Sequence, residues 1–156
     1  MILPAMTAAL LLTQQPAMRL SEESAQEILT GCRAFAEENE LTIAIAVLDD
    51  RLSMLAYRRM DSLREGPAKL AVRKAEYAAE WGSETRRLAD AVGEGRLGWA
   101  FTSGGPPIEG GVPVYTSEGV LLGGVGVSGA SAADDALCAK AGIERAGLKP
   151  ARPPAD

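Results

Sequence analysis

The chain has 156 residues, a length typical of a single domain with a hydrophobic core of its own. Hydrophobic residues make up 47% and charged residues 24% of it, as in ordinary soluble globular proteins. The net charge of -5, without a run of lysine or arginine, argues against a nucleic-acid partner, because binding to phosphates requires a clustered positive surface.

The first 19 residues are predicted to be an apolar extension, not a targeting signal. Residues 1–12 are apolar, but the segment lacks a positively charged start, Pro4 interrupts it, and its apolar centre is too short for a signal peptide. No stretch of the sequence is expected to span a membrane. We therefore expect a cytoplasmic protein without membrane association, with this extension packed on its own domain or on a neighbouring subunit.

A helix and a hairpin are predicted next. Ser21 is a good N-cap, and apolar residues recur at helical spacing from there to about Asn39. Residues 41–48 form a near-continuous apolar run, which is typical of a strand in the centre of a sheet. The polar turn 49–51 then leads into an antiparallel partner strand over residues 52–58.

The helix predicted over residues 68–81 has a charged residue in the middle of its apolar face. Its solvent face carries Lys69, Arg73, Glu76 and Glu80, and its opposite stripe consists of Leu70, Lys74, Tyr77, Ala78 and Trp81. A buried lysine costs stability unless its ammonium reaches water or a partner. Lys74 therefore either extends to the rim of the core or supplies a cation, or an amine tuned by partial burial, at the edge of a pocket.

The middle of the chain is predicted to be irregular. After a C-cap at Gly82, a short helix over residues 83–92 precedes a glycine-containing connection. Residues 99–101 are compatible with a short strand, and residues 103–107 form a loop.

The final third is predicted to be a hairpin followed by a helix. Its two strands cover residues 110–115 and 120–130, and glycines are frequent in the second strand. Ser131 caps the last helix, with Asp134 at its capping-box position, and this helix ends near Gly147.

The glycine-rich strand contains a dinucleotide-binding pattern that we interpret as packing. Residues 124–129 match G-x-G-x-x-G, but the motif lies within the strand, and only one helix follows it. The glycines therefore favour close packing of a helix on this strand. At the end of the strand, the start of the last helix offers backbone N–H groups to an anionic ligand.

Two residue types limit the possible chemistry. Cys32 and Cys138 fall on the apolar stripes of predicted helices, as small buried hydrophobic residues do, and do not indicate a disulfide or a metal site. Histidine, the commonest metal ligand and general base at neutral pH, is absent. We expect no metal site, and acid–base chemistry would have to come from carboxylates, lysine, tyrosine or cysteine.

The predicted elements follow the order α-β-β-α-α-(β)-β-β-α. Hairpins separated by helices favour an antiparallel sheet of about four to five strands flanked by helices, an α+β domain. We place this domain at residues 20–148, between the N-terminal extension (1–19) and a proline-rich, solvated tail (149–156).

From residue 20 to residue 147 the chain resembles a known family. The residues that carry the resemblance are Val47-Leu48-Asp49, Arg59-Met60-Asp61, Arg73-Lys74-Ala75 with Ala78-Ala79, Gly110-Gly111-Val112-Pro113, and the stretch 123–129 with Asp134-Asp135. These motifs are similar to those of the GlcG/HbpS family, also called the haem-degrading or DUF336 domain, which includes the C-terminal domain of PduO-type proteins. The resemblance implies an antiparallel α+β fold, homo-oligomers of two or more subunits and, in several members, binding or degradation of haem.

Two departures from the family pattern bear on function. Without histidine, haem would need Tyr57, Tyr77, Tyr115, Met60 or a cysteine as its axial ligand, or would bind without a strong protein ligand. The first hairpin turn has Asp50-Arg51-Leu52 where family members commonly place a glycine, so the geometry of this loop is expected to differ.

The first functional hypothesis is a small-ligand-binding protein of the GlcG/HbpS type, which binds or degrades haem or a related acidic molecule. Carboxylates such as propionates would be received by Arg58, Arg59 and Lys74, and by backbone N–H groups between residues 128 and 131. The residues predicted to contact the ligand are Arg58, Arg59, Tyr77, Tyr115, Gly126, Ser128, Gly129 and Ser131.

Two other hypotheses stay open. A cofactor-independent enzyme for proton transfer, cyclisation or hydrolysis of a small metabolite would use Asp61 and Asp134 as bases and Lys74 as a cation or amine. Its hydrogen-bond donors would be Ser128, Tyr77 or Tyr115. Alternatively, Asp61 ends a strand and Asp134 caps a helix. The third hypothesis is an assembly or accessory protein without chemistry of its own, whose apolar N-terminus and alanine-rich helices make subunit contacts.

Overall fold

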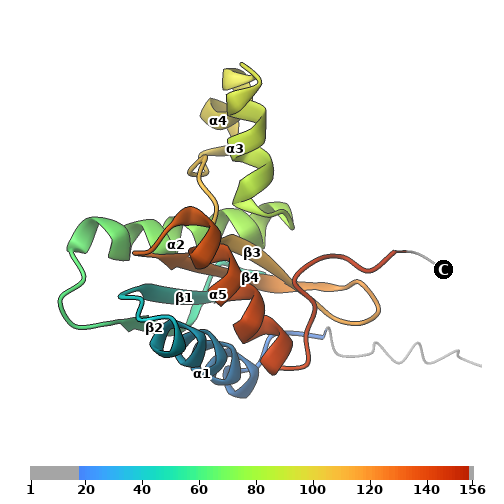
Figure 1. The fold of residues 1–156 in the computed structure, drawn as a ribbon. Helices are drawn as coiled ribbons and strands as arrows, with labels where there is room; N and C mark the ends of the chain where they lie inside the picture. The colour runs from blue at the N-terminus through green and yellow to red at the C-terminus, as the bar shows by residue number, and fades with distance from the viewer. Residues whose placement is uncertain (1–17, 155–156) are drawn as a thin grey trace, which may run out of the picture.

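A four-stranded antiparallel sheet lies between two helical layers in the computed structural model, which describes residues 18–154 (Figure 1). The elements are α1 (Glu22–Glu38), β1 (Ala44–Asp49), β2 (Met54–Arg59), α2 (Glu65–Trp81), α3 (Thr85–Gly93), α4 (Leu97–Ser103), β3 (Gly111–Tyr115), β4 (Leu121–Ser128) and α5 (Ala132–Arg145). The α+β class with an antiparallel sheet flanked by helices is confirmed.

One short element differs from the prediction. Residues 99–101 belong to helix α4, and α3 and α4 together form an arm that projects from the body of the domain (Figure 1). The aromatic residues favoured a strand by propensity, but no strand within residues 18–154 lies beside them, so the backbone forms its hydrogen bonds locally in a helix. The side chain of Phe101 consequently remains 86% exposed.

The sheet has the strand order β2-β1-β4-β3, with β1 and β4 in its centre. Ala44, Ala46 and Leu48 of β1 face α2, while Ile45 and Val47 face the core under α1 and α5. Both faces of β1 are therefore covered, which explains the uninterrupted apolar run that predicted a central strand.

Glycines in β4 allow α2 to pack directly on the strand. A Cβ atom added at Gly124 would lie 2.5 Å from the backbone nitrogen of Ala79 and 2.6 Å from the carbonyl oxygen of Ala75. A Cβ at Gly126 would come equally close to the backbone nitrogen of Ala75. The interpretation of this motif as close helix–strand packing is confirmed, and the backbone of α2 fills the space along the strand.

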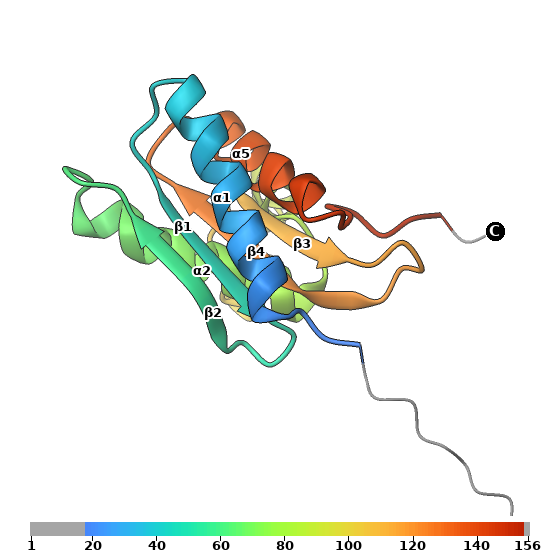
Figure 2. The same ribbon diagram turned by 90° about the horizontal axis from the view of Figure 1, so that it is seen from below.

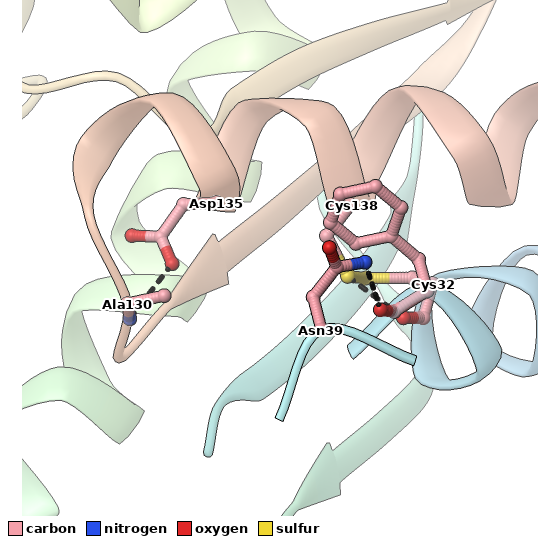
Figure 3. Close-up of a disulfide and its surroundings, with 6 residues drawn as sticks. Cys32, Asn39, Ala130, Asp135 and Cys138 are labelled. Atoms are coloured by element: carbon pink, nitrogen blue, oxygen red, sulfur yellow. Dashed lines mark hydrogen bonds between the residues drawn. A yellow bond between two sulfur atoms is a disulfide. The ribbon is translucent and has the colours of Figure 1, made fainter. Parts of the chain in front are cut away.

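The opposite face of the sheet is covered by α1 and α5, which lie side by side (Figure 2). Contrary to the prediction, Cys32 of α1 and Cys138 of α5 form a disulfide, with their Cα atoms 4.6 Å apart (Figure 3). Small residues allow this approach, because a Cβ at Gly31 would lie only 3.0 Å from the Cα of Gly142. The sequence placed each cysteine correctly on a buried stripe but could not show that the two stripes face each other.

The two ends of the chain were predicted to be an apolar extension and a solvated tail. The apolar extension lies almost entirely outside the described residues. At the other end, Lys149 pairs with Tyr115 through two backbone hydrogen bonds of 2.9 Å, so the first part of the predicted solvated tail is held against the end of β3. Within residues 18–154, no helix has the length and apolar character needed to cross a membrane.

Candidate functional site

The predicted site residues do not gather in one place. Lys74 lies in a buried ion pair in the interior, two predicted tyrosines are buried near the end of α2, and the two predicted arginines line a cleft on the opposite side of the sheet from α2.

Lys74 is fully buried and holds three elements together. Its Nζ donates to the carbonyl oxygen of Val127 at 2.8 Å and to Oδ2 of Asp135 at 2.9 Å. The other carboxylate oxygen of Asp135 accepts the backbone N–H of Ala130 at 3.1 Å (Figure 3). The side chains of Lys74 and Asp135 are 0% and 3% exposed. This ion pair therefore joins the middle of α2 to the end of β4 and the start of α5.

Burial dominates the electrostatics of the pair. Removal from water lowers the pKa of Lys74, while the neighbouring Asp135 carboxylate opposes that shift. Burial likewise raises the pKa of Asp135, and the Lys74 ammonium opposes it. Each charge thus offsets the desolvation free energy of burying the other. Either charge buried without its partner would strongly destabilise the fold.

Gly110 closes the pair off from solvent. A Cβ atom there would lie 2.7 Å from the Nζ of Lys74 and 2.8 Å from the Cβ of Asp135. The residue also has a positive φ of 113°, a conformation that residues with a side chain rarely adopt. The backbone at this position therefore covers the ion pair and leaves no room for a substrate beside it.

Sequence reasoning chose Asp134 and missed its neighbour. Asp134 caps its own helix, because its backbone N–H donates to the Ser131 hydroxyl at 3.1 Å and its carboxylate accepts from that hydroxyl at 2.6 Å. Asp135, one residue further along α5, turns inward to Lys74. The signal that could have found it was the need of a lysine on an apolar face for a buried counter-charge.

The two predicted tyrosines are buried for structural reasons. The ring of Tyr77 packs against Gly105, so a Cβ atom could not be added to this glycine without displacing the ring. Burial raises the pKa of the Tyr77 phenol. Tyr115 donates from its hydroxyl to the carbonyl oxygen of Gly82 at 2.8 Å. Neither ring lines the cleft that contains the predicted arginines.

The predicted residues at the end of β4 divide between core and surface. Ser128 is buried opposite Ala44 of β1, whereas Gly129 and Ser131 are exposed. Because Ala44 also pairs with Arg59 of β2, this strand end and the predicted arginines lie at the same end of the sheet, with β1 between them.

The predicted arginines line a cleft between the C-terminal half of α1 and the edge strand β2, which we call the α1–β2 cleft. Its volume is about 290 Å³, and its lining residues are Arg33, Ala36, Glu37, Glu40, Leu41, Arg58, Arg59, Met60 and Asp61. Three predicted site residues, Arg58, Arg59 and Asp61, are brought together here. A smaller hollow shares Arg33 and Arg58 and continues along α1 to Leu29.

The charges in this cleft are only partly paired. Arg33 forms an ion pair with Glu37 at 2.6 Å, and Arg59 forms one with Glu65 at 2.7 Å. The guanidinium of Arg58 has no ion pair or hydrogen bond with any residue between 18 and 154. Arg58 is therefore the cation of this cleft that is available for an anionic ligand.

Comparison with known proteins finds matches to one protein family. The profile described as "Haem degrading protein HbpS-like" matches residues 20–144. The protein GlcG of Escherichia coli strain K12 is 37% identical over 109 residues, which cover 70% of this chain and 81% of GlcG.

Two solved structures share the fold over nearly the whole domain. A complex of the PduO C-terminal domain with haem superposes with a TM-score of 0.78 at 22% identity, covering 86% of this chain and 100% of that one. A double mutant of Streptomyces reticuli HbpS gives a TM-score of 0.74 at 27% identity, covering 91% and 97% of the two chains.

Proposed function

The chain belongs to the HbpS-like family of haem-degrading proteins, and on that premise we propose that it binds haem, or a related acidic tetrapyrrole, at the α1–β2 cleft. The observation that carries the proposal is the Arg58 guanidinium, which faces this cleft without a carboxylate partner among the described residues. Arginine binds carboxylates such as propionates through paired, charge-assisted hydrogen bonds.

The α1–β2 cleft offers Arg58 for a propionate and the apolar side chains of Leu41 and Met60 for the edge of the macrocycle, which supports the proposal. Haem carries out electron-transfer and oxygen chemistry at its iron, which proteins tune through an axial ligand. Of the ligands considered from sequence, both cysteines are in a disulfide, and Tyr77 and Tyr115 are buried elsewhere. Met60 lines the cleft with Arg58, so its thioether is the protein group that we propose would bind the haem iron.

Tyr57 is less suited to this role than Met60. It lies opposite Ala46 in the sheet, and Ala46 packs toward α2, so Tyr57 lies on the other face of β2 from the cleft. Arg58, by contrast, lies opposite Ile45, which faces the core under α1.

The buried ion pair gives the alternative of a cofactor-independent enzyme no support. Lys74 and Asp135 satisfy each other, and Gly110 covers them. A general base must come within hydrogen-bond reach of its substrate, and the described residues leave no such space at this pair. Asp61 is the predicted catalytic residue that does line the α1–β2 cleft, where it would border a bound ligand.

Hemin titration of the full chain tests the proposal. Because the sequence contains no histidine, any histidine tag must be removed before the measurement, since its imidazoles would ligate the iron. We expect a saturable shift of the Soret band. Replacing Arg58 by Glu should weaken binding by about 10- to 100-fold, the range for loss of a charged hydrogen bond.

Two variants separate the roles of charge and ligation. Arg51→Glu, in the exposed first hairpin turn, makes the same change of charge away from the cleft and should leave hemin affinity unchanged. Met60→Leu conserves volume and should change the spectrum of the bound state more than the affinity. The proposal fails if wild-type binding does not saturate, or if R51E weakens binding as much as R58E.

We further propose that the chain forms homo-oligomers through the projecting arm. Leu97, Trp99 and Phe101 of α4 are 53%, 41% and 86% exposed, and Leu97 and Phe101 share one face of the helix. Exposed apolar patches are typical of protein interfaces. Light scattering should give a mass of two or more subunits for the wild type, and Phe101→Ser should shift it toward the monomer. A monomeric wild type would contradict this.

The disulfide between Cys32 and Cys138 is relevant to the cellular compartment in which the protein resides. The sequence favoured the cytoplasm, where thiols are kept reduced, but the bond between Cys32 and Cys138 favours an oxidising compartment. Cell fractionation with a thiol-labelling assay distinguishes the two.

A further inference from the structure

A second cleft lies between the start of α3 and the C-terminal segment of the described chain, and we call it the arginine cleft. Its volume is about 420 Å³, and its lining residues are Gly82, Ser83, Glu84, Arg86, Arg87, Pro150, Ala151 and Arg152. None of these residues was singled out as a ligand contact from sequence, and none lines the α1–β2 cleft.

Tyr115 fixes both walls of this cleft. Its backbone forms two hydrogen bonds of 2.9 Å with Lys149, which hold the C-terminal segment in place. Its hydroxyl donates to Gly82 at the end of α2, and the guanidinium of Arg152 lies 5.5 Å from the centre of its ring. Gly82 has a φ of 55°, and a Cβ there would lie 2.5 Å from the Tyr115 hydroxyl, so the junction between α2 and α3 also requires its glycine.

The charges of the arginine cleft are unbalanced. Arg86 is paired with Asp90 at 3.2 Å and with Glu109 at 3.0 Å, and the Glu84 carboxylate is paired with Lys140 at 3.1 Å. The side chains of Arg87 and Arg152 have no carboxylate partner among residues 18–154.

Two arginines without a carboxylate partner among the described residues therefore line one cleft, Arg87 from α3 and Arg152 from the C-terminal segment, in a chain whose net charge is -5. Helix α3 starts nearby without a side-chain cap, which adds a favourable dipole for a negative charge.

We infer that the arginine cleft binds a small organic anion with at least two negative charges. Two cationic side chains on different walls match an anion with two negative charges, either a dicarboxylate or a doubly charged phosphate group, bound by planar guanidinium groups. The aromatic ring beneath Arg152 orients that side chain before binding, which reduces the entropy lost on binding. Pro150 and Ala151 supply a short apolar wall, and the volume is within the range of small-molecule sites.

Titrations of the full chain with two probes, succinate and inorganic phosphate, test this inference and distinguish a dicarboxylate from a phosphate ligand. Amide chemical shifts should move saturably for at least one probe, at Ser83, Arg87 and Ala151. Arg152→Gln and Arg87→Gln should each weaken binding about 10-fold or more, the range for a hydrogen bond to a charged group. Arg152→Lys keeps the charge but lacks the planar fork, so it should weaken binding as well.

Arg51→Gln serves as the matched control, because it removes one exposed arginine outside both clefts. The inference is overturned if neither probe gives saturable shifts at these amides, or if R51Q weakens binding as much as R152Q. A folded R87Q/R152Q variant, checked by its unchanged amide spectrum elsewhere, must lose the binding.

The arginine cleft and the haem proposal can fail separately. Hemin affinity should be unchanged in R87Q/R152Q and reduced in R58E, while succinate or phosphate binding should show the reverse. If hemin binding is lost in R87Q/R152Q and kept in R58E, the arginine cleft takes the tetrapyrrole, and our inference of a separate site for a small anion is overturned.

Discussion

Removing one partner of the buried ion pair should destabilise the domain about as much as removing both. Lys74→Met leaves the Asp135 carboxylate in the interior without its cation, and Asp135→Asn leaves the ammonium with only the Val127 carbonyl as an ordinary partner. Since the two side chains are 0% and 3% exposed, each single variant should lose about 3–5 kcal/mol of unfolding free energy. For a domain of this size the melting temperature should fall by roughly 6–20 °C.

The double variant K74M/D135N should lose less than the sum of the two single losses. It buries no uncompensated charge, and the side-chain oxygen of the introduced asparagine can still accept the N–H of Ala130, as the carboxylate does. We expect a loss close to that of one single variant, which corresponds to a coupling energy of about 3 kcal/mol.

Denaturant unfolding of the four proteins measures this cycle. Lys69→Met, on the solvent face of the same helix with a side chain that is 74% exposed, is the matched control and should change stability by less than about 0.5 kcal/mol. Additive losses in the double variant, within about 0.5 kcal/mol, would show that the pair does not act as a unit and would refute the reasoning.

Three other predictions concern stability. Reducing the Cys32–Cys138 bond, which closes a loop with a sequence separation of 106, should cost about 2–4 kcal/mol, and thiol titration of the unfolded chain should find no free thiol before reduction. Gly126→Ala should destabilise the domain by about 1–3 kcal/mol in thermal unfolding, because the added methyl group meets the backbone of α2. The ion pair should contribute least to stability near neutral pH. Burial raises the pKa of Asp135 above 3.8, so the contribution of Asp135 to the unfolding free energy should grow as pH falls toward 3.8. Burial lowers the pKa of Lys74 below 10.5, so the contribution of Lys74 should grow as pH rises toward 10.5. The difference in unfolding free energy between wild type and K74M/D135N, measured from about pH 4 to 10, should therefore be a curve with its minimum between the two windows.

Local signals in the sequence predicted most of the fold. Ser21 and Ser131 cap their helices as expected, each accepting the N–H of the residue three positions later, and Gly82 ends α2 in a left-handed conformation. These features depend on a few neighbouring residues, so a single sequence suffices to find them. Where the prediction missed, as for α4, the outcome depended on whether a partner strand lay nearby, which local pattern does not specify.

The candidate site was less predictable, because it depends on contacts between distant segments. Lys74 and Asp135 are 61 residues apart, and Cys32 and Cys138 are 106 apart. The sequence indicated an unusual position for Lys74 and buried positions for both cysteines, but it did not single out Asp135. Only the packing of α2 on β4 and of α1 on α5 brings the partners together. Arg152 illustrates the same limit, since its position in a tail gave no sign that Tyr115 would hold it over a cleft.

The way this domain packs also explains where its ligands can bind. Alanine in α2 and glycine in β4 bring the helix backbone against the strand, which stabilises the interior by close contact and leaves no room for a ligand between this helix and this strand. The interior cation, Lys74, is neutralised within the protein. Recognition of an anion must therefore use cations at the edges of the sheet. Arg58 lies on the edge strand β2, and Arg152 lies in the C-terminal segment that runs beside the other edge strand, β3. If hemin or a small dianion perturbed only the amides of β4 beneath α2, the domain would have to open there, and this account of the fold would fail.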